Sequence, residues 1–399
     1  MADPFLADVS RRYDAANEAT LRWMLGRPPL GGGFLDMKMH SITGRDYGLG
    51  DGWRAPDFTY GWIQGRGLEA LTEFASFFET RQPTLSAALD DRAALLREAL
   101  GRLVARDGHA YFCYDRDLRP VRPGPGDQPV PQDKPGGIFT YSDAFAAKGL
   151  LAAALRRRDD ATEPLAFLLR VVAAVEQGRF QMDERIPLSA TNLAAQPDDL
   201  GPRMILLGAA ALLRRAGADI AYAQRFIRHV LDRHFDEQTA LLRNVPDGDA
   251  CNVGHGIEFV GFALEALGDG AERDLVAILG RILQASFRAG FTGPGLALTV
   301  SVGSGAVLDA RCPWWSLPEA IRAAALFHAR TGDPAALALW QQADMAFFGR
   351  YWRTAPPVAY QMMLDDGPVD VVPATPDLDP GYHTGLSLLA ASAAATRRS

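Results

Sequence analysis

The sequence predicts an all-α protein of the (α/α)6-barrel class, in which helical hairpins form a closed ring. Two observations carry this prediction: helical periodicity runs through most of the chain, and the connections between helices alternate between long and short. In LSAALDDRAALLREALGRLVA, for example, Leu85, Leu89, Leu96 and Leu103 recur at spacings of four and seven, which places them on one face of a helix. Similar Ala- and Leu-rich stripes recur along the chain.

The periodic segments give about twelve helices, with starts that sequence patterns locate only to within two to four residues. They begin near residues 5, 62, 84, 140, 162, 202, 219, 255, 271, 315, 333 and 382. The connections before the even-numbered helices are long and rich in Gly and Pro. The connections from an even-numbered helix to the next odd-numbered helix are tight, such as TRQP, RAGAD, GDG and RTGDP.

Alternating connections place all long loops at one end of the ring if successive helices are antiparallel. We therefore expect one catalytic domain over residues 1–399, with the binding residues on the long loops. The Pro-rich stretch 119–136 is then a flap of this domain rather than a linker. The segment ALTVSV (297–302) is β-like and predicts a short strand within a loop.

Composition excludes several function classes. The chain of 399 residues has a formal net charge of −7, so it lacks the basic excess that binding to nucleic acid or an anionic membrane requires. No segment approaches the roughly 18 apolar residues of a membrane span, and the N-terminus lacks the features of a signal peptide. Three scattered cysteines suit a reducing compartment, so we expect a cytoplasmic protein.

Polar and aromatic residues gather near the starts of the even-numbered helices, where an inner ring would turn them toward one pocket. Aromatic rings stack on sugar rings, and polar side chains bind hydroxyl groups, so the set predicts a carbohydrate site. Its members are Tyr60, Trp62, Gln64, Arg66, Tyr141, Asp143, Asn192, His255, Glu258, Trp314, Trp315, Glu319, Tyr382 and His383.

Two of the seven histidines, His255 and His383, are predicted in the first turn of an inner helix. A helix N-terminus favours a neutral imidazole, and two imidazoles titrating near neutrality suit proton abstraction and return beside a carbonyl. The remaining histidines are expected to be surface or structural residues: His40, His109, His229, His234 and His328.

Plainer interpretations stay open at this point. His255 and Glu258 have the i, i+3 spacing of metal ligands, but no neighbouring motif supplies a third ligand, so no metal is expected. The same pair could tie a loop to a helix, the tryptophans could be core residues, and Asp143 could serve only as a helix cap. No nucleotide-binding glycine pattern or GxSxG motif is present, and no cofactor is expected.

Five segments taken in order resemble the N-acylglucosamine 2-epimerase family, which includes cellobiose epimerases and mannose isomerases. They are YGWIQGRGLEAL, YSDAFAAKGLLAA, NVGHGIEFVGFAL, CPWWSLPEAIRAAALFHARTGD and GYHTGLSLL. Their order and approximate spacing resemble the family over nearly the whole chain, from roughly residue 30 to 395. The sequence departs from the family elsewhere. Ile205 and Gly208 stand where many members have polar residues, and Leu386 stands where Arg is common.

The resemblance implies a metal-free barrel in which two histidines act on an opened sugar through a cis-enediol. It implies that His255 and His383 are the acid/base pair, that Glu258 supports His255, and that Arg66 polarises the carbonyl. By the resemblance, Trp315 and Glu319 would line the sugar site. The pattern of polar and aromatic residues at the helix starts, independently of the resemblance, adds the other binding candidates: Trp62, Gln64, Tyr141, Asp143, Asn192 and Tyr382.

The leading hypothesis is thus a sugar epimerase or isomerase acting at C1/C2 of an aldose or N-acyl-hexosamine. A glycoside or unsaturated-uronide hydrolase with two of the carboxylates Asp143, Glu258 and Glu319 is the first alternative. A sugar-binding protein without turnover is the second. The expected partner is a small sugar, and the oligomeric state stays open between a monomer and a homodimer.

Overall fold

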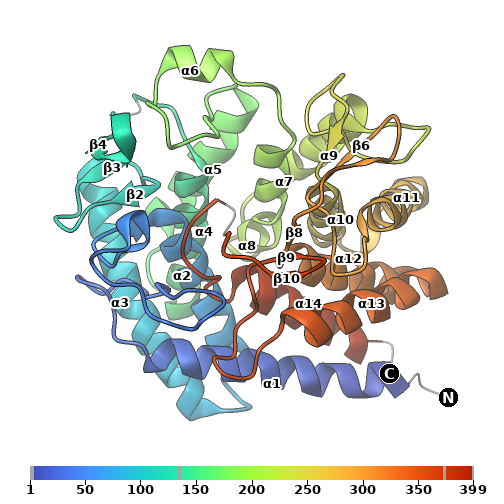
Figure 1. Cartoon of the computed structure of the whole chain (residues 1–399), viewed down its shortest axis with the longest axis horizontal. Coiled ribbons are helices and arrows are strands. Elements are labelled where there is room, and N and C mark those ends of the chain that lie inside the picture. Colours follow the sequence, from blue (N-terminus) through green and yellow to red (C-terminus); the bar gives the residue numbers. More distant parts are fainter. Residues whose placement is uncertain (1–3, 134–135, 372–373, 398–399) are drawn as a thin grey trace.

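The computed structural model describes residues 4–133, 136–371 and 374–397, and their helices form a double ring (Figure 1). The inner helices are α2 (Gly61–Phe78), α4 (Tyr141–Arg157), α7 (Gly201–Leu207), α8 (Ala210–Arg215), α10 (Val253–Leu267), α12 (Ser316–Thr331) and α14 (Ser387–Thr396). The outer helices are α1 (Pro4–Gly26), α3 (Pro83–Asp107), α5 (Thr162–Glu176), α9 (Ala221–His234), α11 (Arg273–Gly290) and α13 (Pro334–Ala346). This confirms the (α/α)6 barrel.

Packing contacts follow the predicted hairpin order. Inner helix α2 packs against α3 and α4, α10 packs against α7, α11 and α12, and α12 packs against α13 and α14. The ring closes where α1 lies along α14 and where the π-helical turn η5 (Tyr382–Leu386) contacts α2. One hydrophobic cluster runs from Leu6 to Ala395 and thus joins both ends of the chain.

The distribution of small and apolar residues explains which helices belong to the inner ring. Helices α4, α10 and α12 are buried on almost every side, and their many Ala and Gly residues allow close neighbours. Outer helix α11 instead buries a stripe that includes Val276, Leu279, Ile282 and Leu283. The predicted helix starts agree with the observed ones to within two residues.

The sixth and twelfth helices differ from the prediction. The sixth is broken at Gly208 and Ala209 into α7 and α8, and a separate short helix, α6 (Ala190–Ala195), lies in the loop before it. The twelfth begins as the turn η5 before it continues as α14, and α13 runs on into a second π-helical turn, η4 (Phe347–Tyr351).

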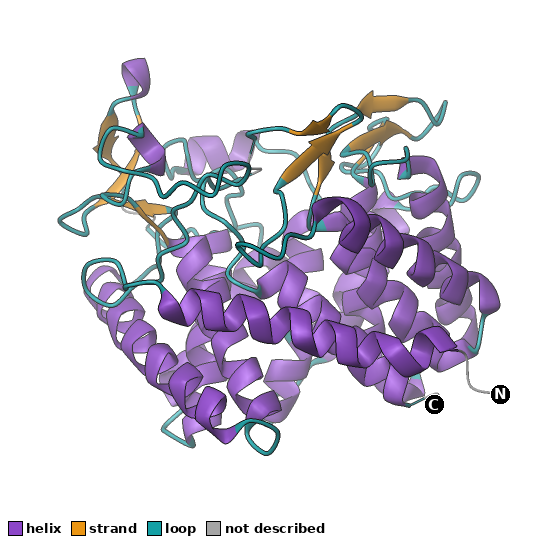
Figure 2. Ribbon diagram, turned by 60° about the horizontal axis from the view of Figure 1, so that its bottom comes forward, coloured by secondary structure: helices purple, strands orange, loops and turns teal. Residues whose placement is uncertain are grey.

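The long loops lie together at one end of the ring and carry the short strands (Figure 2). Strands β1 (Thr59–Tyr60), β2 (Cys113–Tyr114), β3 (Pro120–Pro123) and β4 (Pro129–Pro131) form one antiparallel sheet in that order. The Pro-rich stretch is thus a hairpin of β3 and β4, with the turn η2 (Pro125–Asp127) between them. Residues 134–135 lie outside the described residues.

Two further antiparallel sheets cover the same end. One has the order β5 (Ala250–Cys251), β6 (Thr299–Ser301), β7 (Val307–Asp309), which confirms a strand in ALTVSV. The other has the order β10 (Gly367–Pro368), β9 (Met362–Leu364), β8 (Cys312–Pro313). The turns η1 (Gly52–Arg54) and η3 (Gly268–Gly270) complete the described elements. None of the helices in the described part of the chain is long and apolar enough to cross a membrane.

Glycines set the distance between α2 and α4. A Cβ on Gly65 would lie 2.6 Å from the backbone nitrogen of Ala146, and a Cβ on Gly149 would lie 2.5 Å from the carbonyl oxygen of Gly65. Real atoms do not approach so closely, so only glycine allows the two backbones to touch. This contact places Arg66, the residue after Gly65, against α4.

Candidate functional site

A cavity of about 230 Å³ lies among the starts of the inner helices. Several candidates from the sequence line it: Trp62, Arg66, Tyr141, His255, Glu258, Trp314, Trp315 and His383. Helical spacing explains which residues of each helix face the cavity, because residues four apart lie on the same face of a helix. Trp62 and Arg66 follow this rule on α2, as do Tyr141 and Phe145 on α4.

The two imidazoles have the indole of Trp315 as a common neighbour. Its ring centroid is 5.4 Å from that of His255 and 5.8 Å from that of His383, with the ring planes inclined by 30° and 39°. The folded chain therefore brings together two histidines that are far apart in sequence, as predicted.

A chain of charged groups orients His383. Its Nδ1 lies 3.0 Å from Oε1 of Glu319, and Nη1 of Arg322 lies 3.3 Å from the other oxygen of that carboxylate. Glu265 pairs with Arg322 from the far side. Because a carboxylate only accepts, Nδ1 carries the hydrogen, which leaves the Nε2 lone pair of the neutral ring available as a base.

Burial keeps both imidazoles neutral. Burial lowers the pKa of His255 to about 4, and the nearby His383 acts in the same direction. Burial also lowers the pKa of His383, although Glu319 opposes the shift. A neutral imidazole can accept a proton, so both rings are ready to act as bases near neutral pH.

The two carboxyl groups beside His383 differ in charge. Burial, followed by the negative charge of Glu319, raises the pKa of Glu258 well above its usual value. Burial opposes ionisation of Glu319 as well, but Arg322 and His383 outweigh it and lower the pKa of that carboxyl group. Like charges at close range cannot both ionise easily, so Glu258 holds the proton of the pair.

Arg66 lies over aromatic rings instead of a carboxylate. Its guanidinium carbon is 4.1 Å from the ring centroid of Phe145, 5.3 Å from that of Trp62 and 5.4 Å from that of Tyr382. Within the described residues no carboxylate lies within ion-pair distance of it. Arg66 therefore offers a cation to any electron-rich oxygen that enters the cavity.

Three polar atoms of the residues lining the cavity are buried without a hydrogen-bond partner among the described residues. They are Nε of Arg66, Nε1 of Trp314 and Oε1 of Glu258. Buried polar atoms rarely stay unpaired, so these atoms suit a ligand that carries several hydroxyl groups, or the water it displaces.

Three predicted binding residues point elsewhere, and the prediction for them is wrong. Gln64 accepts the N–H of Leu35 at 2.7 Å and donates to its carbonyl at 3.1 Å, so its side chain fastens a loop to α2. Asp143 accepts the N–H groups of Ala110 and Thr140 as part of the α4 cap. Gln64 and Asp143 each lie two positions from a cavity residue and thus on the opposite side of the helix.

Asn192 is the third of these residues. It lies within α6 in the loop, where its side-chain N–H donates to the carbonyl of Pro187 at 2.7 Å. It is therefore not at the mouth of the sixth helix, as the sequence had suggested.

Three further candidates act around the cavity in ways that differ from their predicted roles. Glu319 sits behind His383, and the Tyr382 hydroxyl accepts from Nζ of Lys148 at 2.6 Å. Glu258 was expected to hold His255, but its carboxylate lies 3.8 Å from Nδ1 of His383, and no hydrogen bond joins it to His255 in the described residues. The packing of α10 against α12 brings Glu258 to Glu319 and explains the difference.

Sequence reasoning missed Glu184. This buried residue of the loop after α5 accepts the indole N–H of Trp62 at 2.7 Å and the backbone N–H of Ser142 at 3.0 Å. Burial raises the pKa of Glu184 to about 7. Nothing in the local pattern QMDERIP signals this contact. The apolar wall residues Met204 and Leu298 were likewise unpredicted.

Solved structures share this fold along almost the whole chain. A cellobiose 2-epimerase from Spirochaeta thermophila superposes with a TM-score of 0.72 at 16% identity, over 99% of this chain and 98% of its own. A D-mannose isomerase superposes with a TM-score of 0.72 at 13% identity, over 98% and 99%. A GH76A α-1,6-mannanase from a Salegentibacter species gives 0.56 at 12% identity, over 97% and 99%.

Comparisons of sequence alone find no counterpart: no model of a known protein family and no curated protein matches the chain. At 12–16% identity the structural likeness concerns the fold. The chain thus has the (α/α)6-barrel fold that a cellobiose epimerase, a mannose isomerase and a mannanase also have.

Proposed function

We propose that this protein is a sugar epimerase or isomerase of the N-acylglucosamine 2-epimerase family. The observation that carries the proposal is the meeting of two neutral histidines, His255 and His383, with the free cation of Arg66 at one cavity. The fold shared with a cellobiose epimerase and a mannose isomerase supports it.

The proposed reaction moves protons only. One imidazole removes the proton from the carbon next to the carbonyl of the opened sugar, and the electron pair moves onto the carbonyl oxygen. Arg66 stabilises the oxyanion that develops there. For an epimer, the second imidazole takes up a proton from solvent and delivers it to the other face of C2, while the first imidazole releases the proton that it removed. For a ketose, the first imidazole returns its proton to C1, while the hydroxyl proton on C2 passes to the oxygen of C1. Either histidine can serve as the first base, because both are neutral.

The cavity favours a small sugar. At about 230 Å³ it lies below the roughly 300–1,000 Å³ of sites for drug-sized ligands, so we propose a monosaccharide as the substrate. Trp62, Tyr141 and Trp315 offer ring faces to its C–H groups, while the unpaired polar atoms of Trp314 and Glu258 suit its hydroxyls.

Hydrogen exchange tests the proposal directly. Incubation with hexoses and N-acetylhexosamines in D2O, followed by proton NMR, should show loss of the C2–H signal for at least one sugar. His255→Asn and His383→Asn should each slow this exchange by about 10²–10⁴-fold, the usual contribution of a general acid/base. Exchange with no sugar, or full exchange in the double variant, would refute the proposal.

The same experiment separates the alternatives. A hydrolase would release new reducing ends from glycosides without C2 exchange. Among the described residues that line the cavity, however, Glu258 is the one acid, whereas a hydrolase needs two. A binding protein would give calorimetric heat with a sugar and no exchange.

A further inference from the structure

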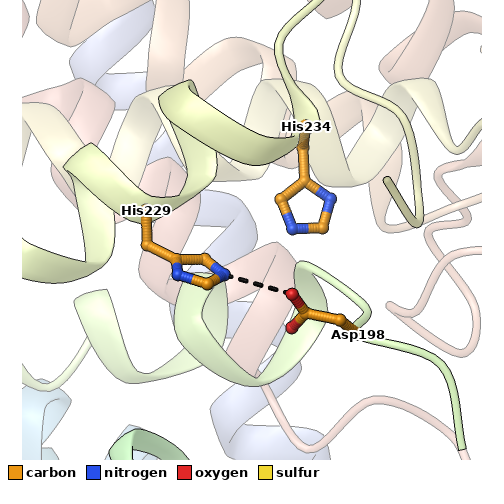
Figure 3. Close-up of side chains that lie close together, drawn as sticks. All are labelled: Asp198, His229 and His234. Atoms are coloured by element: carbon orange, nitrogen blue, oxygen red, sulfur yellow. Dashed lines mark ion pairs between the residues drawn. The ribbon is translucent and has the colours of Figure 1, made fainter. Parts of the chain in front are cut away.

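A second cluster of possible ligand atoms lies outside the sugar cavity. It joins Asp198, in the loop before α7, to His229 and His234 in the last part of α9 (Figure 3). One ligand atom from each residue lies within 4.8 Å of the others, and Nε2 of His229 is 3.4 Å from Oδ2 of Asp198. Figure 3 shows the two imidazoles and the carboxylate turned toward a common point.

His234 has the features of a metal ligand: one ring nitrogen is held by a hydrogen bond, and the other is left for the metal. The residue is fully buried, and its Nδ1 lies 3.1 Å from the carbonyl oxygen of Arg243. A carbonyl only accepts, so Nδ1 carries the hydrogen, and Nε2 of the neutral ring presents a lone pair. That Nε2 atom is buried with no hydrogen-bond partner among the described residues. Metal-binding histidines typically donate their other N–H to a carbonyl in this way.

The surrounding charge leaves one carboxylate oxygen free. Nη1 of Arg203 lies 3.0 Å from Oδ1 of Asp198, which holds the carboxylate while Oδ2 faces His229. The positive charge of the Arg203 guanidinium weakens the attraction of Asp198 for a cation. Its contact is with Oδ1, however, so Oδ2 stays available as a metal ligand. The three buried cysteines are Cys113, Cys251 and Cys312, and none belongs to the cluster.

We propose that Asp198, His229 and His234 bind a divalent transition-metal ion, with zinc as the expected species. Two imidazole nitrogens and one carboxylate oxygen form a common zinc ligand set, which leaves a fourth position for water. Tetrahedral coordination at 2.0–2.1 Å requires ligand atoms about 3.3 Å apart. The side chains of Asp198 and His229 are partly exposed and can rotate to this spacing, whereas His234 is fixed by Arg243.

Such an ion would join an outer helix to the wall of the sugar cavity. Asp199, next to Asp198, accepts the backbone N–H of Gly201 at 2.7 Å, and Gly201 lines the cavity at the start of α7. Bound there, the ion would hold the end of α9 against the loop that leads to α7. This proposal does not depend on the proposed reaction.

Metal titration tests the site on the full chain freed of metal by chelation. Calorimetry with ZnCl2, followed by metal analysis after gel filtration, should give one tightly bound equivalent and a rise in the unfolding temperature. His229→Ala and His234→Asn should each weaken binding by about tenfold or more. Asparagine at 234 retains an N–H for the Arg243 carbonyl, and the side chain of His229 is partly exposed, so neither change needs to unfold the chain.

A control separates this site from the cavity, where Glu258, Glu319 and His383 also lie close together. His383→Asn should leave the zinc stoichiometry unchanged. Bound Co²⁺ should show the strong visible absorption of tetrahedral coordination, and the absorption should disappear in His229→Ala. Absence of binding, or zinc affinity retained in both site variants, would overturn the proposal.

Discussion

At the scale of single residues, the neighbours of each histidine decide its role. His255 and His383 share Trp315 and line the cavity. Nδ1 of His328, in the last turn of α12, instead lies 2.9 Å from the carbonyl oxygen of Asp333, just beyond the end of that helix. His109 contacts Asp143 in the cap of α4. The proposed proton transfer thus rests on the two histidines that line the cavity, whereas His109 and His328 contact groups that cap or end a helix.

Glu319 is expected to act as a positioning residue through His383. In Glu319→Gln the amide oxygen can still accept from Nδ1, but the negative charge that raises the pKa of His383 is lost. We expect kcat to fall about tenfold with KM nearly unchanged, and the acidic limb of the pH profile to move to lower pH. Glu265→Gln, which removes the carboxylate on the far side of Arg322 and leaves the charge of Glu319 in place, serves as the comparison and should move the limb less.

The neutral state of His255 makes stability depend on pH. Its pKa is about 4 in the fold and about 6.5 in an unfolded chain, so the unfolded chain binds more protons between these values. Stability should therefore fall as the pH drops from 6.5 to 4. His255→Asn should flatten this dependence in thermal unfolding followed by circular dichroism. An unchanged slope would contradict the pKa assignment.

Glu184 should act with the opposite sign. Its pKa is about 7 in the fold and about 4.3 when unfolded, so the folded chain binds the extra proton in this window. The contribution of Glu184 to the free energy of unfolding should therefore fall as the pH rises from 4.3 to 7. Glu184→Gln keeps an acceptor for Trp62 and should give a steeper rise of the unfolding temperature with pH over this range than the wild type shows.

At the scale of elements, glycine contacts between inner helices place the functional side chains. Gly65 on α2 and Gly149 on α4 allow the helices to touch, which sets Arg66 against Phe145. The positions of Trp62 and Tyr141 follow from the same contact, because their rings meet at 5.3 Å. A shift of one helix relative to the other would therefore move the rings of Trp62 and Tyr141 together with the guanidinium of Arg66.

Gly65→Ala should separate these helices. The added methyl group would lie within 2.6 Å of the Ala146 backbone, and overpacking of this kind costs about 1–3 kcal/mol of unfolding free energy. Activity should fall as well, because Arg66 moves. Gly101→Ala on α3 is the matched control. Its methyl group meets no atom within 4 Å, so it should stabilise the chain by about 0.5–1 kcal/mol in urea denaturation.

At the scale of the whole molecule, the first and last long loops meet through a buried ion pair. Nζ of Lys38, after α1, lies 2.7 Å from Oδ1 of Asp377, shortly before η5, and both side chains are buried. The ammonium also lies 4.4 Å from the ring centroid of Tyr60 at the start of α2. This ion pair therefore joins the two loops on either side of the point where the ring closes.

Removal of one partner of this pair should be costly. Lys38→Met leaves Asp377 buried without its partner, which typically lowers the free energy of unfolding by about 3–5 kcal/mol. The double variant Lys38→Met with Asp377→Leu should recover most of that loss, since no uncompensated charge remains. Chemical denaturation of the four proteins of this cycle measures the coupling. Equal losses in the single and double variants would contradict it.

Local patterns in the sequence predicted the order of the helices, the end of the ring with long loops, and the cavity faces of α2, α4 and α10. These features depend on side-chain spacing within one segment. The positions of Gln64 and Asp143 were predicted wrongly, because both residues satisfy backbone groups of distant loops at Leu35 and Ala110. Glu184 was missed for the same reason, since its partner Trp62 is far away in the chain.

Periodicity and motif order are properties of the linear chain, so they were sufficient to predict the class of fold and the candidate pair His255 and His383. The contact of Glu319, rather than Glu258, with an imidazole and the meeting of Asp198, His229 and His234 became visible in the folded chain. Hydrogen bonds and electrostatic interactions act over a few ångströms. Which groups come that close depends on how α9, α10 and α12 pack, and no single segment of sequence contains that information.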